Sequence, residues 1–238
     1  MCGIAVILPG SELEPPPSAI EQMIAALTHR GPDAQECVRL PGCHLGHTRL
    51  SIIDPANGRQ PMTEPSDRYT VVFNGEIYNH ADLRRELERD GVTFRTRCDT
   101  EVLLHGYARW GAGVLARLNG QFAFAVWDAV ARTLFAARDR FGEKPLYWAR
   151  TPAGHVLLAS EIKAIEASGL VSLKLDLTSV DAYLGLYYVP PDRSIYQNVH
   201  PLPPAHSATW RAGAGAGGEW ERERPRNRSR SRSFFARM

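Results

Sequence analysis

Hydrophobic positions along the chain gather in short runs separated by polar loops, and the runs follow two different spacings. Runs rich in valine, isoleucine, leucine and phenylalanine are typical of buried β-strands. The predicted strands cover residues 2–8, 43–54, 69–73, 121–128, 133–138, 146–150 and 156–159. The last four of these form two pairs, each joined by a short polar turn.

Apolar residues spaced three or four positions apart predict helices between the strands. The predicted helices cover residues 19–27, 81–90, 100–110, 162–167 and 179–188. Ser18 follows three prolines, and its hydroxyl is expected to cap the first helix. Clusters of strands interrupted by pairs of helices indicate an α+β layered domain and disfavour a regularly alternating parallel sheet.

Two polar stretches predict breaks in the regular structure. Residues 54–67 contain three prolines and a glycine, which favours a surface loop. Asn74-Gly75 follows the strand at 69–73, and Asn-Gly is the strongest short turn dipeptide. The pattern therefore predicts that the buried strand ends at residue 73 and a turn follows.

Composition restricts the class of protein. A chain of 238 residues with 44% hydrophobic and 23% charged residues suits one soluble globular domain. No basic region precedes the short apolar run at the N-terminus, so we expect no signal peptide, no membrane span and a cytoplasmic location. The four cysteines are then expected to stay reduced, although an even number also allows two disulfides. No cysteine or histidine spacing indicates a metal site.

The last part of the chain differs from the rest. Alanine alternates with glycine over residues 212–218, which is a linker composition, and arginine alternates with serine over 226–233. From Glu219 onward seven arginines face three glutamates, so this tail contributes +4 to the total charge of +2 and the body carries −2. The body therefore lacks a basic face for nucleic acid, and the tail is expected to be disordered.

Cys2 is the first candidate for chemistry, because removal of Met1 makes it the N-terminal residue. It then carries a thiol and an α-amino group, whose reference pKa values are about 8.5 and about 7.7–8.0. N-terminal nucleophile enzymes use this combination of nucleophile and base. Because position 2 can hold any residue, Cys2 taken alone is better explained as a small hydrophobic residue that begins a strand.

Other polar residues suit the attack of a thiol on the carboxamide of a free amino acid. Such an attack creates an oxyanion, for which Asn74 and Gly75 offer a side-chain and a backbone N–H. Arg49 suits an α-carboxylate, and Asp99 suits an α-ammonium group. Each residue also has a plainer explanation: Asn74-Gly75 as a hairpin turn, Arg49 as a surface salt bridge and Asp99 as a helix N-cap.

Ordered sequence blocks extend these candidates over most of the chain. They begin with Cys2-Gly3-Ile4 and His29-Arg30-Gly31-Pro32-Asp33. The others lie at residues 46–54, 60–62, 74–80, 99–101, 120–124, 138–147, 159–164, 188–191 and 202–204. The blocks up to residue 124, in this order, resemble class II glutamine amidotransferases. Those at 138–147, 159–164, 188–191 and 202–204 narrow the resemblance to the glutaminase domain of glutamine-hydrolysing asparagine synthetases.

The resemblance implies an N-terminal-nucleophile hydrolase fold, a four-layer αββα sandwich that converts L-glutamine and water to glutamate and ammonia. Cys2 would attack the carboxamide while its α-amino group shuttles the proton, and Asn74 and Gly75 would hold the oxyanion. Arg49 would hold the α-carboxylate, with a strand at 50–53 lining the pocket, and Asp99 would face the ammonium group. The implied glutamine-binding residues are Arg49, Leu50, Ser51, Ile52, Ile53, Asn74, Gly75, Glu76 and Asp99, and none is expected to hold a metal.

The sequence departs from the family pattern in two places. Cys98 stands where a small hydroxyl residue commonly precedes Asp99, which we expect to tune the site without abolishing it. The chain also has no Ser-Gly-Gly-x-Asp-Ser loop of the ATP-pyrophosphatase domain that adenylates aspartate. We therefore expect a glutaminase domain at 2–206, a tail at 207–238 and truncation before the synthetase domain.

These assignments carry expectations about cofactors and partners. The glutaminase domain is expected to need no cofactor, and ATP and Mg²⁺ would serve only the synthetase domain. The expected partners are L-glutamine and either a separate synthetase domain or a second copy of the chain, with no nucleic acid and no membrane. Two alternatives stay open: an amidotransferase that serves another ammonia acceptor, and a non-catalytic or degraded remnant.

Overall fold

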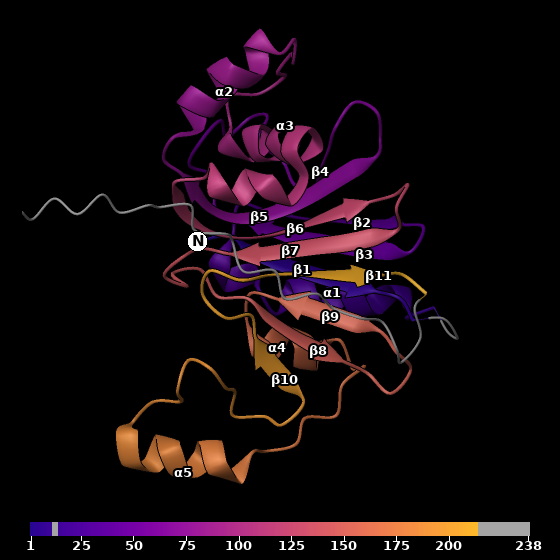
Figure 1. Ribbon diagram of the computed structural model, residues 1–238. Coiled ribbons are helices and arrows are strands. Elements are labelled where there is room, and N and C mark those ends of the chain that lie inside the picture. The colour runs from indigo at the N-terminus through magenta and orange to yellow at the C-terminus, as the bar shows by residue number, and fades with distance from the viewer. Residues whose placement is uncertain (11–13, 214–238) are drawn as a thin grey trace, which may run out of the picture.

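Two antiparallel sheets lie face to face between helices in the computed structural model, which describes residues 1–10 and 14–213 (Figure 1). The six-stranded sheet has the order β10 (Val199–Pro201), β8 (Tyr147–Arg150), β9 (Val156–Ala159), β1 (Gly3–Leu8), β3 (Cys43–Arg49) and β2 (Ala34–Leu40). The five-stranded sheet has the order β11 (Ser207–Arg211), β7 (Thr133–Arg138), β6 (Gly120–Asp128), β5 (Tyr69–Ile77) and β4 (Met62–Thr63). The predicted αββα sandwich is confirmed.

Strand β1 shows how one short apolar run serves two layers. Alternate residues point to opposite faces of a strand. Ile4, Val6 and Leu8 join the core between the two sheets, whereas Ala5 and Ile7 pack with helix residues on the outer face. Because both faces are covered, the run is apolar without interruption and every residue of β1 is buried.

The helices cover the outer faces of the sandwich. Helices α1 (Pro17–Ala25) and α4 (Ile162–Ala167) pack on the six-stranded sheet. Helices α2 (His80–Arg89) and α3 (Asp99–Trp110) pack on the five-stranded sheet, followed by the 3₁₀ turn η2 (Gly111–Ala116). Helix α5 (Leu177–Leu186) stands apart from both sheets, and Ser179 is its one buried residue (Figure 1). Among the described residues no helix is long and apolar enough to span a membrane.

Most predicted elements occur within a few residues of their expected bounds, and the differences have physical causes. Helix α1 begins at Pro17 and has no side-chain cap, so the predicted capping by Ser18 is wrong. The prolines provide the start instead, since proline at the first helical position needs no hydrogen-bond partner. Strand β3 ends at Arg49, so the strand predicted to continue to residue 54 is also wrong.

The tail was expected to begin at residue 207, but β11 occupies Ser207–Arg211 and pairs with β7 along its whole length. Trp210 of β11 is buried in the core between the sheets. The predicted boundary at 206 therefore falls inside the fold. The Arg/Ser-rich part of the expected tail lies outside the described residues.

A buried histidine links the two sheets. His47 on β3 is 1% exposed, and its Nε2–H donates to the Phe73 carbonyl on β5 at 3.1 Å. Burial lowers the pKa of His47 to about 4. The hydrogen bond to Phe73 favours the charged form and opposes this shift, but burial has the larger effect. The neutral Nε2–H imidazole is therefore the form that fits the fold.

The titration of His47 predicts a pH dependence of stability. Because its pKa is lower in the folded than in the unfolded chain, its full contribution is present above about pH 6.5 and falls by about 3 kcal/mol toward pH 4. We expect His47→Gln, which keeps an N–H donor, to remove this part of the dependence of the unfolding free energy on pH. Urea unfolding of both proteins at pH 7 and pH 4 measures it, and equal slopes would contradict the prediction.

Candidate active site

A pocket of about 210 Å³ opens where the start of β1, the loop after β3, the middle of β5 and the start of α3 meet. The predicted site residues that line it are Cys2, Arg49, Leu50, Ile52, Ile53, Asn74, Gly75, Glu76 and Asp99. Ser51 does not line it, and its backbone N–H donates to Asp33 Oδ2 at 2.7 Å. Residues predicted from distant parts of the sequence thus share one cavity.

Cys2 lies partly buried in this pocket, with its thiol against the backbone of Leu50. The Leu50 N–H donates to Cys2 Sγ at 3.4 Å, and the thiol faces the Leu50 carbonyl at 3.7 Å. Burial raises the pKa of the Cys2 thiol, although the Leu50 N–H and the positive N-terminus oppose this. At neutral pH the thiol therefore keeps its proton, and nucleophilic attack by Cys2 needs a base close by.

Beyond the short strand β4, no strand in the described residues pairs with this edge of β5, and side chains bond to its backbone N–H and carbonyl groups instead. The Phe73 N–H donates to Gln60 Oε1 at 2.6 Å, and the Phe73 carbonyl accepts the bond from His47. Four residues further along β5, the Ile77 N–H donates to Asp99 Oδ2 at 3.0 Å. Gln60 and Asp99 therefore do for this edge what another strand would do.

Gly75 lies on the same edge, between Phe73 and Ile77. It stands opposite Phe122 of β6, whose N–H and carbonyl both bond to Asp139 on the far side. Gly75 and Phe122 are thus a non-hydrogen-bonded pair, in which the backbone groups of Gly75 point away from β6. Because Gly75 also lines the pocket, its N–H faces the cavity.

Asn74 adds a second donor at this point. It is 1% exposed, and its Nδ2 has no hydrogen-bond partner among the described residues. A buried amide N–H without a partner costs free energy, so such a group in a pocket marks a place for an acceptor. The predicted turn at Asn74-Gly75 is wrong, because both residues continue β5 and pair with β6.

Arg49 is buried, at 6% exposed, and makes no salt bridge with any described residue. Its guanidinium donates to the carbonyls of Ile53 (3.3 Å), Asp54 (2.8 Å) and Pro55 (2.8 Å). Arginine has five N–H donors, so two remain for a ligand in the pocket. The predicted strand at 50–53 is replaced by a loop that curls around this guanidinium, with Gly58 beside it.

Asp99 is the first residue of α3 but does not act as its N-cap. Cys98 occupies the cap position and makes no cap bond, whereas the Asp99 carboxylate reaches across to β5. Burial raises the pKa of Asp99, and the Ile77 N–H opposes that shift. A cationic group placed in the pocket would compensate the buried carboxylate.

The sequence analysis did not predict that Arg138 and Asp139 support the site. The Asp139 carboxylate accepts backbone N–H bonds from Phe122, Phe141, Glu143 and Lys144, and so shapes the loop that carries Lys144 to the pocket. The one sequence feature that could have indicated this role is the charged stretch at 138–144 between two strands. Within residues 1–10 and 14–213 no cluster of three or more His, Cys, Asp or Glu side chains could hold a metal ion.

Comparison with known proteins adds independent information. Residues 1–221 match the family described as "Glutamine amidotransferase domain". The chain is 39% identical over 214 residues to asparagine synthetase [glutamine-hydrolyzing] 3 of Bacillus subtilis (strain 168), covering 88% of this chain and 35% of that protein. It is 41% identical over 222 residues to a putative asparagine synthetase [glutamine-hydrolyzing] of Mycobacterium tuberculosis (strain H37Rv), covering 85% and 34%. The chain thus spans about a third of the length of these relatives.

A solved structure shows the same fold. The glutamine phosphoribosylpyrophosphate amidotransferase from B. subtilis superimposes with a TM-score of 0.69 at 20% identity, covering 93% of this chain and 49% of that one. At this identity the likeness concerns the arrangement of sheets and helices. It supports the sandwich of two antiparallel sheets between helices that the sequence blocks predicted.

The close approach of strands at Gly75 predicts that this position accepts only glycine. A Cβ there would lie 2.2 Å from the Gln121 carbonyl oxygen and 2.7 Å from the Phe122 Cα, both backbone atoms that cannot turn aside. We expect Gly75→Ala to destabilise the fold by about 1–3 kcal/mol in urea unfolding. Gly113→Ala is the matched control, because its Cβ would meet nothing closer than 3.9 Å. Equal effects of the two changes would contradict the prediction.

Proposed function

The chain belongs to the glutamine amidotransferase domain family, and from this premise we propose that it hydrolyses L-glutamine to L-glutamate and ammonia. The observation that carries the proposal is the buried Nδ2 of Asn74, which has no partner in the described part of the chain and lies in the same pocket as the Cys2 thiol. A nucleophile and a vacant donor are the two parts that acyl transfer from an amide needs.

The proposed reaction begins with Cys2 as the N-terminal residue. Its α-amino group takes the thiol proton while the sulfur attacks the carboxamide carbon of glutamine. The tetrahedral oxyanion accepts hydrogen bonds from Asn74 Nδ2 and the Gly75 N–H. The ammonium form of the α-amino group then returns the proton to the leaving nitrogen, and ammonia departs. Water attacks the resulting thioester by the same route, which releases glutamate and restores the thiol.

Selection of a free amino acid follows from the charges around the cavity. The two remaining N–H donors of Arg49 suit an α-carboxylate, and the buried Asp99 carboxylate suits an α-ammonium group. The backbone loop that surrounds Arg49 fixes the direction of its guanidinium. Glu76 lines the same pocket and adds negative charge at the ammonium end.

The relatives' names couple glutamine hydrolysis to asparagine synthesis. We propose accordingly that the ammonia serves the amidation of aspartate, and we place that step in the part of those proteins that this chain does not span. The partner would be a synthetase domain, with the reaction placed in the cytoplasm, where the four free thiols stay reduced. No observation favours another ammonia acceptor.

The nucleophile assignment predicts that Cys2→Ala abolishes ammonia release from glutamine, with a loss of at least about 10³-fold. Intact mass measured first on the wild-type chain should show that Met1 is absent. Cys37→Ala is the matched control, because Cys37 is an exposed cysteine on β2 and should leave the rate unchanged. Ammonia release by Cys2→Ala at the wild-type rate would refute the assignment.

The oxyanion assignment predicts that Asn74→Ala lowers kcat about 10²–10³-fold with little change in KM. The reason is that the amide donor is used only after the carbonyl oxygen becomes negative. Asn79→Ala is the control. It also removes a side-chain amide, but this amide lies at the start of α2 and donates to the Arg117 carbonyl at 2.9 Å, so kcat should not change. A variant at Asn74 that raises KM and keeps kcat would argue for simple substrate binding instead.

A further inference from the structure

The start of β1 lies beyond the end of its ladder with β9. Pairing runs from Leu8 opposite Val156 to Ala5 opposite Ala159 and stops there. Ser160 extends the contact by one step, since its Oγ accepts the Ile4 N–H and its own N–H donates to the Ile4 carbonyl, both at 3.0 Å. On this side, therefore, no strand of the described chain pairs with Cys2.

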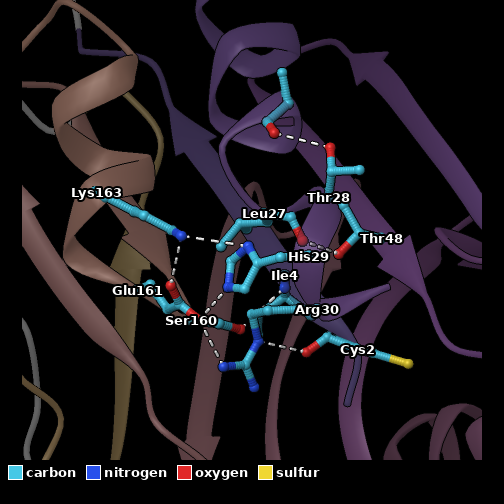
Figure 2. Close-up of polar contacts among 11 residues, drawn as sticks. Cys2, Ile4, Leu27, Thr28, His29, Arg30, Thr48, Ser160, Glu161 and Lys163 are labelled. Carbon is cyan, nitrogen blue, oxygen red and sulfur yellow. Dashed lines mark hydrogen bonds and ion pairs between the residues drawn. The ribbon is translucent and has the colours of Figure 1, made fainter. Parts of the chain in front are cut away.

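A buried arginine holds the backbone of Cys2 instead (Figure 2). The Arg30 Nε–H donates to the Cys2 carbonyl at 2.9 Å, and Arg30 Nη1 donates to Glu161 Oε1 at 2.8 Å. Arg30 is 8% exposed, and its Nη2 has no partner among the described residues. The direction of the guanidinium therefore depends on the two bonds to Cys2 and Glu161.

Glu161 remains charged at this position because neighbouring side chains donate hydrogen bonds to its carboxylate or place positive charge beside it. His29 Nε2 lies 2.9 Å from Oε1 and Lys163 Nζ lies 3.4 Å from Oε2 (Figure 2). Burial alone would raise the pKa of Glu161, but the hydrogen bonds from Arg30 and His29 lower it to about 2. The ion pair with Arg30 is thus present throughout the neutral range.

Glu161 does not line the pocket, so it has no contact with a bound amino acid. It reaches Cys2 through one intervening residue, Arg30. The carbonyl that Arg30 holds is attached to the same Cα as the thiol-bearing side chain and the α-amino group. Fixing that carbonyl limits rotation about the Cys2 backbone, and a terminal residue otherwise keeps much of this freedom.

We propose that Glu161 is a positioning residue for the nucleophile: by fixing Arg30, it sets the direction in which the thiol and α-amino group of Cys2 enter the pocket. The inference rests on the proposed glutaminase function and deepens it. Misplacement of a reacting group by about 1 Å can cost about 10²-fold in rate, so a residue outside the pocket can control the reaction.

The test compares Glu161→Ala and Glu161→Gln with the wild-type chain. We expect Glu161→Ala to lower kcat for glutamine hydrolysis about 10–100-fold while KM changes less than about 3-fold. The kcat of Glu161→Gln should lie between those of the wild-type chain and Glu161→Ala, because the glutamine amide oxygen still accepts the Arg30 Nη1–H. If Glu161 acts through Arg30, Glu161→Ala in an Arg30→Met background should add no further loss, which a double-mutant cycle measures.

A second readout separates direction from reactivity. We expect Glu161→Ala to slow covalent labelling of Cys2 by a glutamine-like diazoketone about as much as it lowers kcat. Labelling by iodoacetamide, which needs no fixed direction, should change less than about 3-fold. Asp128→Ala is the matched control, because it breaks another ion pair, with Arg68 at 2.8 Å, at the opposite end of β6 from the pocket. It should lower the free energy of unfolding and leave kcat unchanged.

The possible results are distinguishable. Wild-type kcat and labelling in Glu161→Ala would overturn the positioning role and leave the proposed function intact. Equal slowing of both reagents, or full additivity with Arg30→Met, would overturn it in favour of a general structural role. If the wild-type chain released no ammonia from glutamine, both the proposed function and this inference would fail.

Discussion

A sheet edge must find partners for its N–H and carbonyl groups, and the site depends on how one edge of β5 meets this requirement. Strand β4 covers only the first part of that edge. Gln60, His47 and Asp99 supply the partners at Phe73 and Ile77, and they come from a loop, the facing sheet and a helix. Meeting the backbone's demand therefore assembles the walls of the pocket, and the uncovered N–H of Gly75 becomes available for chemistry.

Two arginines, the buried Arg49 and the half-buried Arg138, repeat the same solution away from β5. Arg49 donates to three successive carbonyls of the loop after β3, and Arg138 donates to the carbonyls of Gly142, Lys144 and Leu202. Carbonyl groups in irregular segments near the core would otherwise lack donors. Each arginine thus gives a loop with no regular pairing a fixed shape, and both loops carry residues to the pocket.

Sequence reasoning located most elements and the residues of the pocket. Its errors lie where contacts with distant parts of the chain decide the structure. Runs covered on both faces, such as β1 and β6, have a strong apolar pattern. The edge strand β2 is half exposed and mixed in character, so it gave no signal. Asn74-Gly75 has the local preference of a turn, which pairing with β6 overrides. The roles of Arg30, Glu161 and Asp139 rest on contacts between distant parts of the chain, which local patterns do not contain.

Strand β11 has a practical consequence for work with this domain. It is the outermost strand beside β7, and it contributes Trp210 to the core between the sheets. A protein cut at residue 206 would lose that side chain and leave the whole of β7 as an open edge. Open, apolar edges pair readily with other chains, so such a protein would be prone to aggregate even with every pocket residue in place.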